Sequence, residues 1–369
     1  MAEAAAVLAA EPSGAAAGDT MGAPAPDTRP AILTIAGLVK KFGDFTALKG
    51  IDLKVRDGEF LTIVGPSGSG KTTLIRLLVG MDEPTDGAIL LRGKNIERVP
   101  ANQRPTCMVF QSLALFPHRS VGENIEFPLK IRGEPKARRK ARALELLKLL
   151  HLPEHYYKKR IHECSGGEKQ RVALARALAF DPEILFFDEP LSALDYRLRK
   201  ALEKELKALH AQTGKTFVYI THSLEEAMVM SDRIAIMRAG RFEQIGTPDE
   251  IYDRPGSRFV AEFMGDVNLF ALGRDADLTA MPEGAGPGTL VVRPEAIAIL
   301  PTGAHADYEA TGTLAQEYNL GGRIQYEIET ASGRTITMEC LAGDRPAVRL
   351  GDPVRLGWDA AGCHVMREG

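Results

Sequence analysis

Short apolar runs alternate with longer amphipathic segments along the first two thirds of the chain. The run at 60–64 is rich in β-branched and aromatic residues, stops at Gly65, and is followed by a helical pattern over 71–79. A strand, a glycine loop and a helix in this order open an α/β unit. Further short runs typical of strands occupy 31–36, 184–187, 217–220 and 234–237.

Two segments carry leucines at helical spacing along one face. The first is the charged stretch 135–150, and we interpret 112–162 as a helical insertion in the α/β domain. The second is a longer helix that is expected to end at Gly214. The apolar faces are formed by Leu144, Leu147 and Leu150 in the first segment and by Leu194, Leu198, Leu202, Leu206 and Leu209 in the second.

The pattern changes after about residue 268. Residues 271–290 are rich in Gly, Pro and Asp, and short β-like runs follow, separated by turns such as Gly321-Gly322 and Ser332-Gly333. Many short strands with frequent turns predict a small β-barrel domain. The runs occupy 290–293, 296–300, 323–329, 335–339 and 354–357.

The chain of 369 residues is long enough for two or three domains. We place an α/β domain at 30–268 and a β domain at 269–369, after a tail at 1–29. The tail is rich in Ala, Gly and Pro and carries acidic residues, which predicts a disordered segment rather than a signal peptide. Met21 is an alternative start to Met1.

Composition argues against several classes of function. Lys and Arg number 46 against 49 Asp and Glu, and the resulting net charge of −3 gives no basic excess for binding nucleic acid. The 4 cysteines are far apart without a C-x-x-C motif, which argues against a zinc site or a disulfide framework and fits a reducing cytoplasm. No apolar run approaches the roughly 18 residues that span a membrane, so we expect any membrane association to be peripheral.

One segment carries a specific pattern for phosphate binding. Residues 65–72 match G-x-x-x-x-G-K-[ST], in which glycines let backbone N–H groups surround phosphates. Lys71 is expected to reach the β- and γ-phosphates, Thr72 to hold Mg²⁺, and the following helix to attract anions. The alternative, a glycine turn before a helix, is disfavoured by the strand and helix on either side. The segment reads Gly65, Pro66, Ser67, Gly68, Ser69, Gly70, Lys71 and Thr72, followed by Thr73.

Two acidic residues follow the apolar run at 184–187. An acid at the carboxyl end of a parallel strand lies where phosphate sites open. Asp188 is expected to hold Mg²⁺, and Glu189 to orient or deprotonate an attacking water. The alternative is that both acids cap the turn before Pro190, and the residues alone leave it open.

Ser165, Gly166, Gly167 and Glu168 precede a helical run at 172–178. Ser165 and Glu168 have the spacing of a capping box, which by itself predicts only the start of a helix. The functional alternative is that Ser165 and the glycine N–H groups bind a γ-phosphate. The two interpretations are compatible because helix N-termini bind anions.

The order of these motifs resembles the nucleotide-binding subunit of an ABC transporter over about residues 31–265. Two further residues join the resemblance, although neither indicates a function alone: Gln111 follows an apolar pair, and His222 follows the run at 217–220. The elements in family order are the Walker A motif at 65–72, Gln111 as the Q-loop, the signature at 164–168, Walker B at 184–188 with Glu189, the D-loop at 192–195, and His222 as the switch histidine.

The resemblance implies an α/β P-loop ABC-type ATPase domain with a helical subdomain at about 112–162, which hydrolyses ATP with Mg²⁺. It implies a head-to-tail homodimer in which each ATP lies between Walker A of one chain and the signature of the other. Phe42 takes the position of the adenine-stacking aromatic, and its alternative is a small core aromatic. The implied roles are catalytic for Glu189, His222, Lys71 and Gln111, metal-binding for Thr72, Gln111 and Asp188, and nucleotide-binding for Phe42, residues 65–73, Ser165, Gly166, Gly167 and Glu168.

The signature departs from the family's usual Leu-Ser-Gly-Gly-Gln at two positions. Cys164 replaces Leu, which suits a small apolar pocket. Glu168 replaces Gln and places a carboxylate near a triphosphate, although a capping role would soften that repulsion. We expect these departures to affect the rate of ATP hydrolysis rather than the assignment of the chain to this family.

Other segments resemble import ATPases. Residues 113–130 resemble the region that receives a permease's coupling helix, with Leu115, Phe116 and Pro117 as candidate contacts or, alternatively, internal packing residues. The segments 259–268 and 292–295 resemble a TOBE-type OB-like domain. The resemblance implies two integral membrane permease subunits, an extracytoplasmic solute-binding protein acting indirectly, no nucleic-acid partner, and a peripheral position at the cytoplasmic face of the inner (plasma) membrane.

The segments 224–233 and 242–248 most resemble the polyamine, opine and phosphonate branch, which favours spermidine or putrescine. Iron(III), sulfate, phosphonate and sugar importers remain alternatives. A soluble, non-transport ABC ATPase acting on ribosomes or DNA is a further alternative, against which the single cassette, the near-neutral charge and the β-rich tail argue. A third hypothesis, compatible with the first, is that the β domain binds a regulator that restrains the ATPase.

Overall fold

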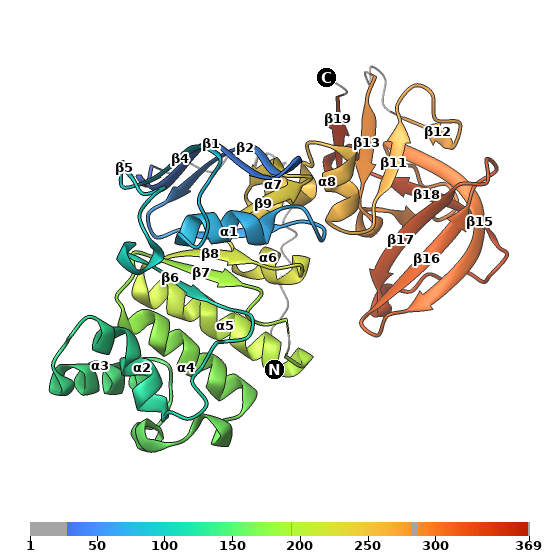
Figure 1. Ribbon diagram of the computed structural model, residues 1–369. Coiled ribbons are helices and arrows are strands. Elements are labelled where there is room, and N and C mark those ends of the chain that lie inside the picture. The colour runs from blue at the N-terminus through green and yellow to red at the C-terminus, as the bar shows by residue number, and fades with distance from the viewer. Residues whose placement is uncertain (1–27, 193, 282–286, 368–369) are drawn as a thin grey trace, which may run out of the picture.

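The computed structural model describes residues 28–192, 194–281 and 287–367. Apart from its last two positions, the tail expected at 1–29 lies outside the described residues. Figure 1 shows an α/β domain, coloured blue to yellow, and a strand-rich C-terminal domain in orange and red. The predicted fold class is confirmed.

A six-stranded sheet forms the centre of the α/β domain. Its strand order is β10-β9-β3-β8-β7-β6, and neighbours are parallel except for β10 against β9. Because parallel strands end at one edge, the segments that follow β3, β8 and β7 meet there. The strands are β3 (Phe60–Val64), β6 (Thr106–Val109), β7 (Ile184–Asp188), β8 (Thr216–Ile220), β9 (Arg233–Arg238) and β10 (Arg241–Gly246).

Both faces of this sheet are covered, which explains its unbroken apolar runs. Ile184 and Phe186 pack in the same layer as the helix α1, whereas Leu185 and Phe187 pack in the layer of the helix α5. Figure 1 shows the two helices on opposite sides of the sheet. The expected end of the longer helix is confirmed, because Gly214 caps it in the left-handed conformation. The helices are α1 (Lys71–Val79) and α5 (Tyr196–Thr213).

A second, antiparallel sheet adjoins α1 and has the strand order β2-β1-β4-β5. Only its first strand was expected from the sequence, and only as the short run 31–36. Register shifts interrupt the pairing of β1 with β2 at several points, and such irregularities hide the two-residue period on which strand prediction depends. The strands are β1 (Ala31–Phe42), β2 (Phe45–Arg56), β4 (Asp86–Leu91) and β5 (Lys94–Asn95).

A helical subdomain interrupts the sheet between β6 and β7, where an insertion was expected. Its helix α3 buries Leu147 and, just past its end, Leu150, while Leu144 is half-buried against the same core. Helix α4 packs on α2 and α3, so the helical unit continues beyond residue 162. The helices are α2 (Val121–Ile131), α3 (Lys136–Leu149) and α4 (Gly166–Ala179), with the 3₁₀ turns η2 (Glu154–Lys158) and η3 (Ile161–Glu163) before α4.

The C-terminal domain contains two sheets, in the orders β11-β13-β19 and β14-β18-β15-β16-β17, with β12 paired to β15. Trp358 lies at the centre of its core, with ring centroids 5.1 Å from Phe270 and 6.0 Å from Tyr308. The long strand β15 was not expected because it contains a glycine and many polar residues. The strands are β11 (Asn268–Ala271), β12 (Leu278–Ala280), β13 (Thr289–Val292), β14 (Ala298–Ile299), β15 (Tyr308–Asn319), β16 (Arg323–Glu329), β17 (Thr335–Leu341), β18 (Pro353–Trp358) and β19 (Cys363–Met366).

One buried arginine joins the two domains. Arg293 donates hydrogen bonds to the backbone oxygens of Tyr252 (2.9 Å) and Ala261 (3.0 Å), and its guanidinium lies 4.1 Å from the centroid of the Tyr252 ring. The Tyr252 hydroxyl in turn donates to Glu295 Oε1 at 2.7 Å. The arginine therefore satisfies backbone acceptors of the short helices that precede the C-terminal domain. These are α7 (Pro248–Asp253) and α8 (Arg258–Phe263), which follow α6 (Leu224–Met230).

We expect Arg293→Met to lower the free energy of unfolding by about 3 kcal/mol, because it leaves buried carbonyl oxygens without donors. Urea denaturation of the full chain measures this change. The matched control is Arg323→Met, which removes an exposed ion pair with Glu339 and should cost less than about 1 kcal/mol. Equal effects of the two substitutions would contradict the role given to Arg293.

Candidate functional site

The loop between β3 and α1 requires glycine at specific positions. A Cβ on Gly65 would lie 2.1 Å from the backbone oxygen of Met237 on β9. Gly70 caps α1 with φ 107°, which favours glycine, and its Cβ would lie 2.9 Å from Leu48 Cδ2. The loop is thus pressed between two sheets, while Ser67 and Gly68 at its tip stay exposed.

Lys71 is held beneath this loop. Its Nζ donates to the backbone oxygens of Gly65 (2.8 Å) and Pro66 (3.1 Å). Burial lowers the pKa of Lys71, and the carboxylates of Glu189 and Asp188 oppose that shift. The ammonium group is therefore in the electrostatic reach of both acids, and it is placed to meet an anion bound by the loop. Thr72 and Thr73 follow in the first turn of α1, exposed and half-exposed respectively.

Asp188 and Glu189 lie at the carboxyl end of β7. Burial raises the pKa of Asp188, as does the neighbouring Glu189 carboxylate, while Lys71 lowers it. Glu189 has φ 46°, a left-handed conformation that costs a non-glycine residue of order 1 kcal/mol or more. Its N–H nevertheless continues the sheet by donating to the Ile220 oxygen at 2.9 Å. Strain of this kind persists where the surroundings fix a residue, and it points to a functional position.

His222 and Gln111 meet Glu189 from two other segments. His222 Nδ1 lies 3.2 Å from Glu189 Oε2, and its side chain is 64% exposed. Gln111 Nε2 donates to Ser192 Oγ at 3.0 Å, and that hydroxyl donates to the Glu189 backbone oxygen at 2.9 Å. Residues from three segments that are far apart in sequence thus converge at one edge of the sheet, beside Lys71.

The residues expected to hold Mg²⁺ suit that ion. Thr72, Gln111 and Asp188 offer hydroxyl, amide and carboxylate oxygens, which are the donors that Mg²⁺ prefers. Within the described residues no group of three or more His, Cys, Asp or Glu could hold a metal by itself.

The signature residues form the start of α4. Ser165 is the N-cap, and its hydroxyl accepts from the Glu168 N–H while the Glu168 carboxylate accepts from the Ser165 N–H. A Cβ on Gly167 would lie 2.9 Å from Leu198 Cδ1, so α5 approaches closely here. Cys164 is buried and burial raises the pKa of its thiol, which agrees with the small apolar site expected for it.

The signature and the phosphate loop contact different parts of the chain. The side-chain contacts of Glu168 are with Tyr156 and Lys159 in the helical subdomain, and those of Lys71 are with the loop and the acids after β7. One chain therefore brings together Lys71, Gln111, Asp188, Glu189 and His222, but not the signature residues.

Phe42 lies at the end of β1, where it pairs with Phe45 across the turn into β2. Its side chain is 52% exposed and Lys40 Nζ lies 5.1 Å from its ring centroid. The alternative interpretation as a core aromatic is wrong, because the ring projects from the sheet. An exposed aromatic face is available for stacking.

The three candidate permease contacts differ in exposure. Phe116 packs on Phe127 with centroids 4.6 Å apart, Leu115 is half-buried against the core, and Pro117 is exposed. Internal packing thus explains the partial burial of Leu115 and Phe116, whereas Pro117 is exposed.

Sequence reasoning missed one residue near this segment. Arg176 on α4 donates to the backbone oxygens of Leu113 and Ala114, at 2.6 Å each. Both acceptor residues have left-handed φ angles, of 59° and 45°. The arginine therefore ties the segment after Gln111 to the helix that begins with the signature. A single cation in the last turn of a helix gave no signal in the sequence.

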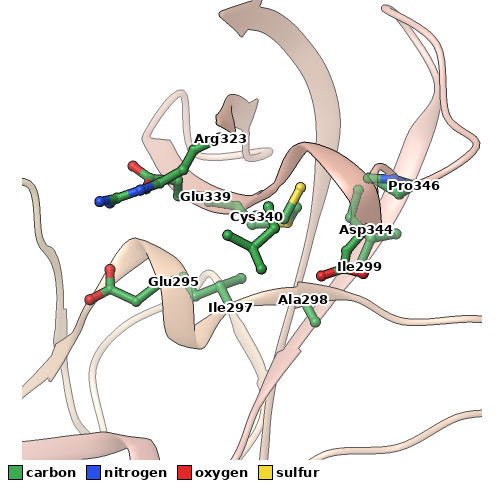
Figure 2. A pocket seen from close by; sticks show the side chains of 11 residues that line it. Glu295, Ile297, Ala298, Ile299, Arg323, Glu339, Cys340, Asp344 and Pro346 are labelled. Atoms are coloured by element: carbon green, nitrogen blue, oxygen red, sulfur yellow. The ribbon is translucent and has the colours of Figure 1, made fainter. Parts of the chain in front are cut away.

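A hollow of about 620 Å³ lies on the C-terminal domain. Figure 2 shows Glu295 and Ile297 on one side of it and Arg323, Glu339 and Cys340 on the other. Arg323 pairs with Glu339 at 2.7 Å. None of the residues predicted for nucleotide binding lines this hollow, so it is distinct from the site at the sheet edge.

Comparison with known proteins agrees with the two parts of the fold. The ABC transporter family model matches residues 48–192, and the TOBE domain model matches residues 290–366. The chain is similar to the dimeric structure of MJ0796, a bacterial ABC transporter cassette, with TM-score 0.52 and 33% identity over 58% of this chain and 98% of that one. It is also similar to cbiO1 from Clostridium perfringens, with TM-score 0.56 and 30% identity over 60% of this chain and 90% of that one.

Curated relatives extend across both domains. The spermidine/putrescine import ATP-binding protein PotA 1 of Pseudomonas aeruginosa is 43% identical over 337 residues, 84% of this chain and 90% of that protein. The PotA of Roseobacter denitrificans is 52% identical over 241 residues, 65% of this chain and 66% of that protein. The Fe(3+) ions import ATP-binding protein FbpC of Brucella abortus is 41% identical over 342 residues, 89% of this chain and 94% of that protein.

No helix in the described part of the chain has the length and apolar character needed to cross a bilayer. A phosphate loop, two acids after a strand and a capped glycine pair are joined here to a TOBE domain, and a relative of 43% identity is matched along 90% of its length. The chain belongs to the ATP-hydrolysing, ATP-binding subunits of ABC transporters that carry a C-terminal TOBE domain.

Proposed function

We propose that this chain powers the import of polyamines, spermidine or putrescine, by hydrolysing ATP. The observation that carries the ATPase site is the convergence of Lys71, Asp188 and Glu189 with His222 at one sheet edge. The substrate class rests on the PotA relatives, of which one is 43% identical across 90% of its length.

In this proposal the residues of one chain position the phosphates and the attacking water. The loop N–H groups and Lys71 bind the β- and γ-phosphates, and Lys71 exchanges its bonds to the Gly65 and Pro66 oxygens for phosphate oxygens. Glu189 accepts a hydrogen bond or a proton from water, and His222, 3.2 Å away, holds the carboxylate and the γ-phosphate in register. Mg²⁺ on Thr72, Gln111 and Asp188 would neutralise charge that develops on the phosphates.

The remaining contacts come from a second copy. Ser165, Gly166 and Gly167 of one chain would meet the γ-phosphate bound by the other, because the signature lies apart from the loop within a chain. ATP then joins the two copies head to tail, and hydrolysis releases them. The similarity to a dimeric cassette supports this arrangement.

We further propose that two permease subunits receive this motion near Phe116 and Pro117, and that a solute-binding protein supplies them from outside. The chain would be peripheral, at the cytoplasmic face of the membrane. Arg176 offers a route for the motion, because it connects the signature helix α4 to Leu113 and Ala114, just before these residues.

Iron(III) as the transported ion is the second candidate. It is favoured by the FbpC relative, which is 41% identical and is covered over 94% of its length. The polyamine proposal is placed first because two PotA relatives match at 52% and 43% identity.

Glu189→Gln should lower ATP turnover about 1,000-fold, or about 4 kcal/mol of barrier, because the amide cannot take a proton from water. ATP binding should remain, since Lys71 and the loop are untouched. Steady-state phosphate release and nucleotide titration measure the two effects. Glu262→Gln, which changes an exposed carboxylate on α8, is the control and should turn over normally. Near-normal turnover of Glu189→Gln would refute the assigned role.

Uptake of labelled putrescine and spermidine should stop in cells that carry Glu189→Gln in place of the native chain. Labelled iron(III) uptake in the same cells is the comparison. Loss of polyamine uptake alone supports the proposed substrate, whereas loss of iron uptake alone supports the second candidate. Unchanged uptake of both would leave the ATPase assignment in place and reject both substrates.

Phe42→Ala should raise the KM for ATP about tenfold with little change in kcat, because stacking of a base on an aromatic ring contributes about 1–3 kcal/mol. Phe45→Ala is the matched control, since Phe45 lies opposite Phe42 in the same hairpin and is 66% exposed. Equal KM values for the two variants would show that Phe42 does not stack on the base.

A further inference from the structure

The first turn of α4 holds a carboxylate where the proposed function requires an anion to bind. Glu168 is the third residue of the helix, directly after Gly166 and Gly167. The N–H groups of a first helical turn have no partner within the helix and are the groups that bind phosphate. An uncompensated negative charge beside them would repel a triphosphate.

Both oxygens of this carboxylate are taken up by donors from the same chain. Glu168 Oε2 accepts from the Ser165 N–H at 2.8 Å and from Lys159 Nζ at 3.0 Å. Glu168 Oε1 accepts from the Tyr156 hydroxyl at 2.8 Å. The carboxylate is therefore turned back toward the segment before α4 and is fixed at both ends.

The same contacts that orient the Glu168 carboxylate also neutralise its charge. The Ser165 N–H, Lys159 and Tyr156 together lower the pKa of Glu168 to about 2, so the group stays ionised. The Lys159 ammonium lies 3.9 Å from the centroid of the Tyr156 ring, and the Lys159 and Glu168 side chains are each 22% exposed. Lysine, tyrosine and carboxylate thus form one packed, electrically neutral cluster.

We propose that Lys159 and Tyr156 are positioning residues for the signature. They hold the Glu168 carboxylate in its capping position, against the segment before α4, and cancel its charge, so that the N–H groups of Gly166 and Gly167 stay open to the γ-phosphate held by a second copy. This inference rests on the proposed function, because it assumes that the signature meets ATP across a dimer. It follows that a glutamate at the fifth signature position requires a neighbouring cation.

The test measures the ATP concentration that gives half-maximal dimerisation of the full chain by analytical ultracentrifugation, in the hydrolysis-deficient Glu189→Gln background. Lys159→Met should raise this concentration about tenfold at low salt, because it leaves the negative charge of Glu168 without a cation beside the phosphate. Added salt should reduce the difference, because it screens that repulsion. Lys158→Met removes the same charge from the adjacent exposed position and should have little effect.

Rescue separates a charge effect from a packing effect. Glu168→Gln introduced into the Lys159→Met chain removes the carboxylate. The ATP concentration that gives half-maximal dimerisation should then return to within about twofold of the parent's value. An equally impaired double variant would overturn the inference, as would a Lys159→Met chain that behaves like the parent. Failure of the parent itself to dimerise with ATP would reject the proposed function, a result that is visible before any change at Lys159.

Discussion

The arrangement of the α/β domain depends on the placement of negative charge at one edge of its central sheet. Asp188 and Glu189 are consecutive acids at the end of a buried strand, where burial and the neighbouring Glu189 carboxylate raise the pKa of Asp188. Lys71 lies within electrostatic reach of both and is itself partly desolvated. A site built to hold a triphosphate beside two carboxylates needs cations and backbone donors on every other side, and the phosphate loop supplies them.

The other links in the domain connect that edge to distant segments. Ser192 joins Gln111 to the backbone of Glu189, and Arg176 joins the segment after Gln111 to the helix of the signature. These hydrogen bonds connect the turns after β6 and β7 with each other and with α4, so the sheet edge and the helical subdomain are in direct contact. Separately, Arg293 links the helices α7 and α8 to the C-terminal domain.

Much of this could be predicted from the sequence, where local chemistry determines the structure. The strand at 60–64, the helix at 71–79 and the cap at Gly214 were recognisable because apolar runs, glycine and capping residues act within a few positions. Most of the antiparallel sheet and the strand β15 were missed, because bulges and polar residues obscure the alternation of apolar and polar residues that identifies a strand. These strands are stabilised by pairing with their neighbours, which the sequence alone does not show. The packing of Lys159 and Tyr156 on Glu168, and of Arg176 on the segment after Gln111, depends on tertiary contacts that no local pattern reveals.

The left-handed backbone at Glu189 affects which substitutions the domain tolerates at this position. Glycine would adopt this backbone conformation without the steric cost that a side chain brings, so the backbone at this position favours a residue without a carboxylate. If Glu189 acts on water as proposed, a substitution chosen for thermal stability alone could remove turnover.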